Sequence, residues 1–227
     1  MRYLDEKAGK VHFAMTNRKL RCVSSQEIST LCKAFGFSPA NIRQVLLRKG
    51  MLAPLFFKGI YYVKNTSETL TKTLPSDPLF LSSLACNKKL DNDWYFGLHT
   101  ALKLNGLAGV QTPVKTFIIT KKQIIPGTRV MQGMEFVFSR IKSVPFDIGI
   151  IERDDLRYSD QIRTVLDFLH LGIKKKNTKY AEVVLETVLE KNKKEFLLKS
   201  PKYMEHFSTK DRMEEIIKKH LGGYGAL

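Results

Sequence analysis

Six polar side chains between residues 41 and 58 are of the types that contact double-stranded DNA: Asn41, Arg43, Gln44, Arg48, Lys49 and Lys58. Arginine can pair with the edge of guanine, and asparagine or glutamine can pair with adenine. Lysine and arginine also hold a protein on the phosphate backbone. The sequence therefore predicts base or near-base contacts from the first four residues and phosphate contacts from the two lysines.

The first element needed to position these side chains is a short helix after residue 24. Ser24 and Glu27 have the spacing of a capping box, in which each side chain accepts a hydrogen bond from an unpaired N–H group at the helix start. An apolar stripe with helical spacing follows: Ile28, Leu31, Cys32 and Phe35. Because Gly36 interrupts this pattern, we expect the helix to end there.

A second helix, which carries four of the six side chains, is predicted next. Ser38 can cap it, Pro39 fits its first turn and Gly50 ends it. Its inward-facing residues are apolar: Ile42, Val45 and Leu46. Leu47 suits two positions, because it could contact a thymine methyl group or complete the core.

Residues 54–63 complete the pattern as a hairpin. Two short runs of β-forming residues flank Lys58 and Gly59. Two helices joined by a tight turn and followed by such a hairpin form a winged helix-turn-helix, whose second helix commonly enters the DNA major groove. The same arrangement also serves as a protein–protein module or as scaffold. The outward residue types favour DNA binding among these three interpretations.

The distribution of charge also favours a polyanionic partner. The 227 residues carry a formal net charge of +16. Residues 1–68 contain 12 Lys and Arg against 4 Asp and Glu, whereas residues 69–170 contain 13 against 10 and residues 171–227 contain 13 against 8. A basic surface attracts nucleic acid through counterion release, whatever the base sequence. The excess is concentrated in the predicted winged helix, which strengthens the DNA-binding interpretation.

Composition excludes several other classes. The chain is 43% hydrophobic and 26% charged, as in ordinary globular proteins. We expect no membrane contact, because no run of about 18 apolar residues occurs. The first residues lack the apolar core of a signal peptide, so a cytoplasmic location is expected. The scattered cysteines Cys22, Cys32 and Cys86 predict free thiols rather than disulfides or a zinc site.

The pattern along the whole chain predicts an α+β fold. The expected domains are a winged helix-turn-helix in residues 1–68 and a mixed α/β domain with a small sheet in residues 69–227, helical from about residue 172. A polar joint is expected at residues 66–78. Further helices and strands are predicted from periodicity and turn residues: helices at residues 79–86, 93–105 and 159–171, strands at residues 115–120, 134–139 and 146–151, and connections at Gly127 and Gly133.

Catalytic chemistry has little support in the sequence. No phosphate-binding loop, nucleophile elbow or metal-type histidine spacing occurs. Asp91 and Asp93 have the spacing of a divalent-ion pair in nucleotidyltransferases, but the glycine-serine turn that precedes such a pair is missing. Asp147 and Glu152 loosely suggest a metal-dependent nuclease, yet Asp154 stands where a lysine is needed. We expect no enzyme, no catalytic residue, no metal and no cofactor.

Four motifs in order resemble one known family: the wing around Gly50–Leu52 and Gly59–Tyr62, the segment Tyr95–Leu107, the strand 115–120 and the segment Tyr158–Asp167. Over roughly residues 10–170 the chain resembles the AbiE-type (AbiEi family) antitoxins, transcriptional regulators of type IV toxin–antitoxin phage-defence systems. The family pattern indicates structural roles for Asp160 as a helix cap and for Asp167 as the i, i+4 partner of Arg163 on a surface.

The resemblance implies an antitoxin that represses its own operon by binding inverted repeats and that counteracts a nucleotidyltransferase toxin. One winged helix reads few base pairs, so we expect a homodimer at least on DNA. One alternative is a DNA-binding protein of a mobile element that acts in replication or partition without a toxin. The other is a metal-dependent nuclease or nucleotidyltransferase that the winged helix directs to DNA.

Overall fold

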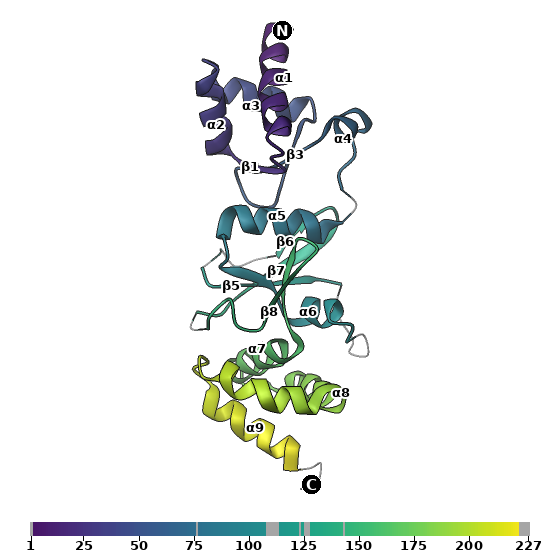
Figure 1. The fold of residues 1–227 in the computed structure, drawn as a ribbon, viewed down its shortest axis with the longest axis vertical. Helices are drawn as coiled ribbons and strands as arrows, with labels where there is room; N and C mark the ends of the chain where they lie inside the picture. Colours follow the sequence, from purple (N-terminus) through teal and green to yellow (C-terminus); the bar gives the residue numbers. More distant parts are fainter. Residues whose placement is uncertain are drawn as a thin grey trace. The chain divides into compact units, whose positions relative to one another are not determined.

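A computed structural model describes residues 2–75, 77–107, 114–122, 124, 128–142 and 144–222 (Figure 1). The chain forms two compact units, Met1–Asp91 with Val130–Gly133 and Asn92–Arg129 with Met134–Leu227. The fold is mixed α and β with helical N- and C-terminal parts, as expected. Residues 69–91 group with the N-terminal unit, while the proposed domain boundary at residue 68 stays a prediction. None of the described helices is both long and apolar enough to cross a bilayer.

The first unit begins with three helices and a three-stranded sheet. Its elements are α1 (Arg2–Asn17), β1 (Cys22–Ser24), α2 (Ser25–Ala34), α3 (Pro39–Arg48), β2 (Leu52–Pro54) and β3 (Ile60–Val63). All pairings in the sheet are antiparallel, in the order β1-β3-β2. Apolar side chains of the three helices and the sheet form one core. This core fixes the orientation of α3 and therefore the direction of its polar side chains.

Local signals predicted the presence of α2, α3 and the hairpin correctly, but two details are wrong. Phe35 follows α2 and is 44% exposed instead of completing its buried stripe, and the first strand of the hairpin ends at Pro54, where it was expected to begin. Ser24 and Glu27 form the expected capping box of α2. Ser38 occupies the N-cap position of α3, but its side chain makes no capping hydrogen bond, so the predicted cap is wrong in that detail. The strand β1 was not predicted; it adds to β3 with Cys22 opposite Tyr62. Three residues are too few to show the alternating pattern that predicts a strand.

The segment expected to be a polar joint contains a helix. Asn65 and Glu68 form a capping box that starts α4 (Thr66–Thr71). The helix α5 (Pro78–Leu90) follows, close to the predicted helix at residues 79–86. A buried hydrogen bond joins His12 Nε2 and the Lys64 carbonyl oxygen at 2.7 Å, which ties α1 to the chain just after β3.

A mixed sheet has the order β6-β7-β5-β4-β9-β8, and its strands other than β6 lie wholly in the second unit. Its strands are β4 (Trp94–Phe96), β5 (Thr116–Thr120), β6 (Thr128–Met131), β7 (Met134–Arg140), β8 (Ile150–Arg153) and β9 (Leu156–Ser159). The central pairing β5–β7 is parallel, as is β4–β9, whereas β4–β5 and β8–β9 are antiparallel. The predicted strands at 115–120 and 134–139 are confirmed.

Two predictions in this unit are wrong. The expected helix at residues 93–105 is instead β4 followed by α6 (Leu98–Leu104), and Asp91 ends α5 rather than starting a helix. The residues of β4 are fully buried in the middle of the sheet, so tertiary packing outweighs the capping signal. The strand expected at 146–151 begins only at Ile150 and forms a hairpin with β9 through Asp154 and Asp155, both in the left-handed region.

Three helices complete the unit: α7 (Gln161–Lys174), α8 (Lys179–Met204) and α9 (Lys210–Gly222). Figure 1 shows them together below the sheet, with α7 nearest to it. The helix α7 is buried over most of its length, and α8 has a kink at Asn192. The expected connection at Gly127 and the last five residues lie outside the described residues.

Candidate nucleic-acid interface

The exposed side of α3 displays three of the predicted DNA-contacting side chains. Asn41, Gln44 and Arg48 are exposed and recur at spacings of three and four residues, so they share one side of the helix. Arg43 lies on the opposite flank of the exposed side and is half-buried. Leu47 is also half-buried and packs against the core, which resolves its position. The exposed side of α3 therefore has two amide groups and Arg48 along one flank and Arg43 along the other.

One serine joins the start of α2 to both α3 and the hairpin turn. The Ser25 backbone N–H donates to the Gly59 carbonyl oxygen at 2.8 Å. Arg43 Nη1 donates to the Ser25 hydroxyl at 3.4 Å, a long hydrogen bond. Gly59 has a φ of +79°, and a Cβ atom there would lie 3.1 Å from the Ser25 hydroxyl oxygen. The exposed Lys58 precedes Gly59, so the structure brings the lysine-bearing turn and Arg43 to the same place.

At the other end of α3, one carboxylate of α1 forms ion pairs with two of the residues predicted to contact DNA. Asp5 Oδ1 lies 3.4 Å from Arg48 Nη2, and Asp5 Oδ2 lies 3.2 Å from Lys49 Nζ. This contact was not predicted, because Asp5 precedes Arg48 by 43 residues and no local pattern links them. Arg48 and Lys49 can reach a phosphate only in competition with Asp5.

The remaining carboxylates of residues 1–68 are engaged as well. Glu6 pairs with Lys10, and Glu27 pairs with Lys88 and caps α2. Glu68 caps α4 and accepts a hydrogen bond from Tyr62. None of the six predicted residues other than Arg48 and Lys49 takes part in an ion pair among the described residues. Arg43 and Lys58 therefore keep their full charge for an anionic partner.

Electrostatics at the start of α2 favour a stable support for this region. Burial acts to raise the pKa of the Glu27 carboxyl, but the Lys88 ammonium and the Ser24 backbone and hydroxyl groups outweigh it and lower the pKa. Nearby, burial raises the pKa of the Cys22 thiol to about 12. Cys22, Cys32 and Cys86 form no disulfide with one another, in line with the prediction. A neutral thiol is a poor nucleophile, so Cys22 acts here as a packing residue.

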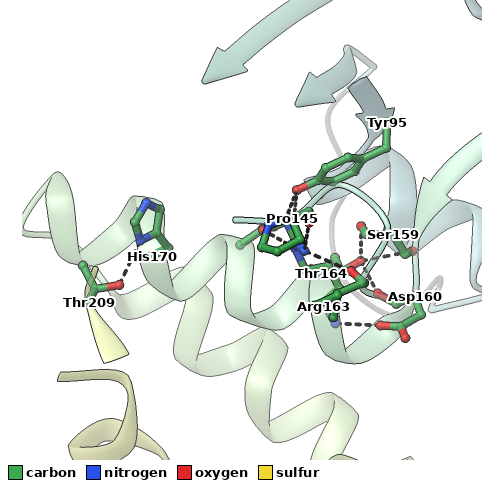
Figure 2. Close-up of polar contacts among 10 residues, drawn as sticks. Tyr95, Pro145, Ser159, Asp160, Arg163, Thr164, His170 and Thr209 are labelled. Atoms are coloured by element: carbon green, nitrogen blue, oxygen red, sulfur yellow. Dashed lines mark hydrogen bonds and ion pairs between the residues drawn. The ribbon is translucent and has the colours of Figure 1, made fainter. Parts of the chain in front are cut away.

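The second unit contains an arginine in the opposite situation. Arg163 and Asp167 form the predicted i, i+4 ion pair at 3.0 Å, but both side chains are 0% exposed, so the expected surface location is wrong. Arg163 also donates to the Tyr95 hydroxyl at 3.0 Å, and to the carbonyl oxygens of Pro145 at 3.0 Å and Ile148 at 2.9 Å (Figure 2). The network joins α7 to β4 and to the segment before β8.

The start of α7 is fixed by further hydrogen bonds. Asp160 is the N-cap, as predicted, and accepts from the Arg163 backbone N–H at 2.7 Å and from the Tyr203 hydroxyl at 2.9 Å. Ser159 and Thr164 share a buried hydroxyl–hydroxyl contact at 2.7 Å (Figure 2). All donors in this network are directed at groups of the chain itself. The cluster therefore has the character of a structural support.

Two histidines, His99 half-buried and His170 fully buried, lack the features of a catalytic pair among the described residues. His99 packs among aromatic rings, and its Nδ1 lies 3.0 Å from the Tyr180 hydroxyl, so the ring is held by contacts within the chain. His170 Nδ1 lies 2.9 Å from the Thr209 hydroxyl, and its Nε2 is buried with no hydrogen-bond partner among the described residues (Figure 2). Burial, helped by Lys174 and Arg163, lowers the pKa of His170 to about 4.

The carboxylates that were considered for catalysis are only partly brought together. Asp93 and Asp147 line one surface hollow of about 500 Å³, which also has Lys121, Lys142 and Arg157 on its wall. Glu152 pairs with Arg157 instead of facing Asp147. Within the described ranges, no group of three or more histidine, cysteine, aspartate or glutamate side chains could hold a metal ion. The hollow thus lacks a cluster of acidic ligands.

No protein-family model matches this chain, and a search of curated proteins found no match.

Proposed function

We propose that the chain is a sequence-specific DNA-binding transcriptional regulator and that residues 1–68 act as a winged helix-turn-helix. In this proposal α2 and α3 form the helix-turn-helix, α3 is the recognition helix, and the β2–β3 hairpin is the wing. The observation that carries it is the Ser25 junction, which places Arg43 of α3 beside the turn that bears Lys58. A recognition helix and a wing tip must lie together to contact adjacent parts of one DNA site.

The polar side chains divide into two roles in this proposal. Asn41, Gln44 and Arg43 read base edges, because amides and guanidinium groups make bidentate contacts there. Lys58 contacts a phosphate beside the groove. Arg48 and Lys49 contribute after exchanging Asp5 for a phosphate oxygen. DNA as the partner agrees with the charge of residues 1–68, which contain 12 basic and 4 acidic residues.

We further propose that the regulator acts as the antitoxin of a toxin–antitoxin system. This half of the proposal depends on the resemblance of residues 10–170 to the AbiE-type antitoxins. It assigns the second unit the task of opposing a nucleotidyltransferase toxin. A gene for a nucleotidyltransferase beside the gene of this chain would support it, and rescue of growth on co-expression would test it directly. Failure to rescue would leave the regulator without an antitoxin role.

The DNA-binding half is tested by measuring affinity for the DNA upstream of the chain's own gene and for a scrambled duplex, across a salt series. Preference for the native site by about a thousandfold or more is expected of a specific regulator. Equal and steeply salt-dependent binding to both duplexes would mean that the basic residues bind any polyanion without sequence preference. No binding to either would make the first unit a protein-contact module and reject the proposal.

A further inference from the structure

The outward side of α1 carries a stripe of side chains that the proposed DNA interface does not use. Tyr3, Glu6, Lys10 and Phe13 recur at spacings of three and four residues and are all exposed. They lie opposite the side of α1 that packs into the core through Ala8, Val11 and Met15. The two aromatic residues are strongly exposed, Tyr3 to 68% and Phe13 to 70%. Lys7 Nζ lies 4.0 Å from the centre of the Tyr3 ring, and the two rings still leave apolar surface exposed at both ends of the stripe, which a partner can cover.

The stripe is complementary to itself when two copies of α1 run antiparallel. If the twofold axis crosses the outward side of α1 at the level of Ala8, whose own side chain faces the core, Tyr3 of one copy faces Phe13 of the other and Glu6 faces Lys10 on both sides of the axis. A twofold contact of this kind uses the same patch on both partners. Within one chain, Glu6 and Lys10 are 2.9 Å apart and mostly exposed, so they can exchange partners without burying a charge.

The surface beside the stripe has room for a second helix. A hollow of about 400 Å³ adjoins Phe13 and is also lined by Ala14 and Phe35, where the ring of the partner's Tyr3 would fit. A Cβ atom on Gly9 would meet no described heavy atom within 4 Å. Packing within the chain therefore does not require glycine at this mid-helix position, where it lowers helix stability relative to alanine. A small residue there lets two helix axes approach to about 8–10 Å.

We propose that α1 is the contact surface for a second copy of this chain, through an antiparallel α1–α1 pair centred at the level of Ala8. The self-complementary order of rings and charges identifies a second copy as the partner. This choice also rests on the proposed function, because an inverted repeat is read by two copies related by a twofold axis. A single helix pair buries less than the standard interface of about 1,600 Å². Self-association is therefore weak in solution and is strengthened on DNA.

The test is sedimentation equilibrium of the full chain without DNA, at concentrations up to several hundred micromolar. Glu6→Lys or Lys10→Glu alone places like charges opposite each other twice in a homodimer. Each variant is expected to associate about tenfold more weakly than the unchanged chain. An equimolar mixture of the two variants should recover association as a heterodimer, because opposite charges then face each other.

The mixture separates an interface from a local role of the Glu6–Lys10 pair. The double variant Glu6→Lys/Lys10→Glu restores the pair within one chain as well as between chains, whereas the mixture restores it only between chains. Lys33→Glu, on α2, changes the net charge by the same amount as Lys10→Glu and should leave association unchanged. A chain that stays monomeric at every concentration, or a mixture that associates no better than its components, would overturn the proposal. Because no DNA is present, neither outcome affects the test of DNA binding.

Discussion

Arg43 and Arg163 show two opposite uses of one side chain in this molecule. Arg163 is fully buried and donates hydrogen bonds to a carboxylate, a phenol and two backbone carbonyl groups. Arg43 is half-buried and donates one long hydrogen bond, to the Ser25 hydroxyl. A guanidinium group has five N–H donors. Arg163 makes four hydrogen bonds within the fold. Arg43 makes one among the described residues, so most of its N–H donors are available to a ligand.

The difference teaches that charge alone does not identify a binding residue. An arginine whose donors are satisfied internally contributes to stability and is unavailable to DNA. An arginine that is anchored at one nitrogen and otherwise open is positioned for recognition at little entropic cost. The predictions below test this contrast, first where it concerns stability and then where it concerns binding.

Replacing Arg163 should produce the largest effect. Arg163→Met leaves the buried Asp167 carboxylate without its cation, with only the Tyr95 hydroxyl still donating to it, and removes the donor to the carbonyl groups of Pro145 and Ile148. We therefore expect the free energy of unfolding to fall by about 3–5 kcal/mol. Urea unfolding followed by circular dichroism measures this change. DNA affinity per folded molecule should stay unchanged.

A paired variant sharpens this prediction. Arg163→Met/Asp167→Leu removes both charges, and it should be less destabilised than the sum of the two single variants. Purely additive losses would show that the two residues act independently, against the network in Figure 2.

His170 differs from both arginines, because burial keeps its side chain neutral in the folded chain. Its pKa is about 4 in the folded chain, against the ordinary value of 6.5. The unfolded chain therefore binds more protons between these values, and stability falls as pH is lowered from about 6.5 to 4. This group should remove about 2.5 kcal/mol between pH 7 and 4.5. Comparing urea unfolding of the unchanged chain with His170→Asn isolates it, and equal pH slopes would contradict the assignment.

Short-range sequence patterns predicted the elements of the fold where local preference and tertiary packing agree. The capping box of α2, the apolar stripe of α3 and the hairpin around Gly59 all rest on neighbouring residues. The prediction failed at Trp94–Phe96, where three buried residues form a central strand although aspartates before them suggest a helix start. Burial on both faces of a sheet depends on partners such as β5 and β9, which lie far along the chain.

The candidate site was predictable to a similar depth. Sequence identified the side chains on the exposed side of α3, because helical spacing fixes direction. It could not place Ser25 between Arg43 and Gly59, or Asp5 beside Arg48, since these contacts join different elements. It also could not show that the i, i+4 pair of Arg163 and Asp167 is buried, because spacing specifies adjacency and carries no information about depth.

For binding, Arg43→Ala should have the largest effect. Loss of a base contact is expected to cost about 1–3 kcal/mol at the specific site and to relax the preference at one base position. Fluorescence anisotropy with the native duplex and single-base variants measures both. Lys218→Ala, which removes one charge in the second unit, is the matched control. Equal losses for Arg43→Ala on native and scrambled duplex would show that Arg43 contacts only phosphate.

Lys58→Ala should act differently from Arg43→Ala. Removal of a phosphate contact weakens binding to all sequences alike and reduces the salt slope by about 1. The measurement is the dependence of the observed binding constant on salt for native and scrambled duplexes. A selective loss on the native duplex would assign Lys58 to base readout, and no loss would place the hairpin turn away from DNA.

Asp5→Asn should have the smallest effect and the opposite sign. The variant frees Arg48 and Lys49 from their shared carboxylate. Surface ion pairs are worth under about 1 kcal/mol, so stability should change little. DNA binding should become tighter and its salt dependence steeper, because two cations no longer exchange a carboxylate for a phosphate. Asp211→Asn, in the second unit, controls for the change in net charge. Weaker binding by Asp5→Asn alone would mean that Asp5 holds α1 against α3 in the DNA-binding arrangement. Its ion pairs would then stabilise the fold, as the Arg163–Asp167 pair does.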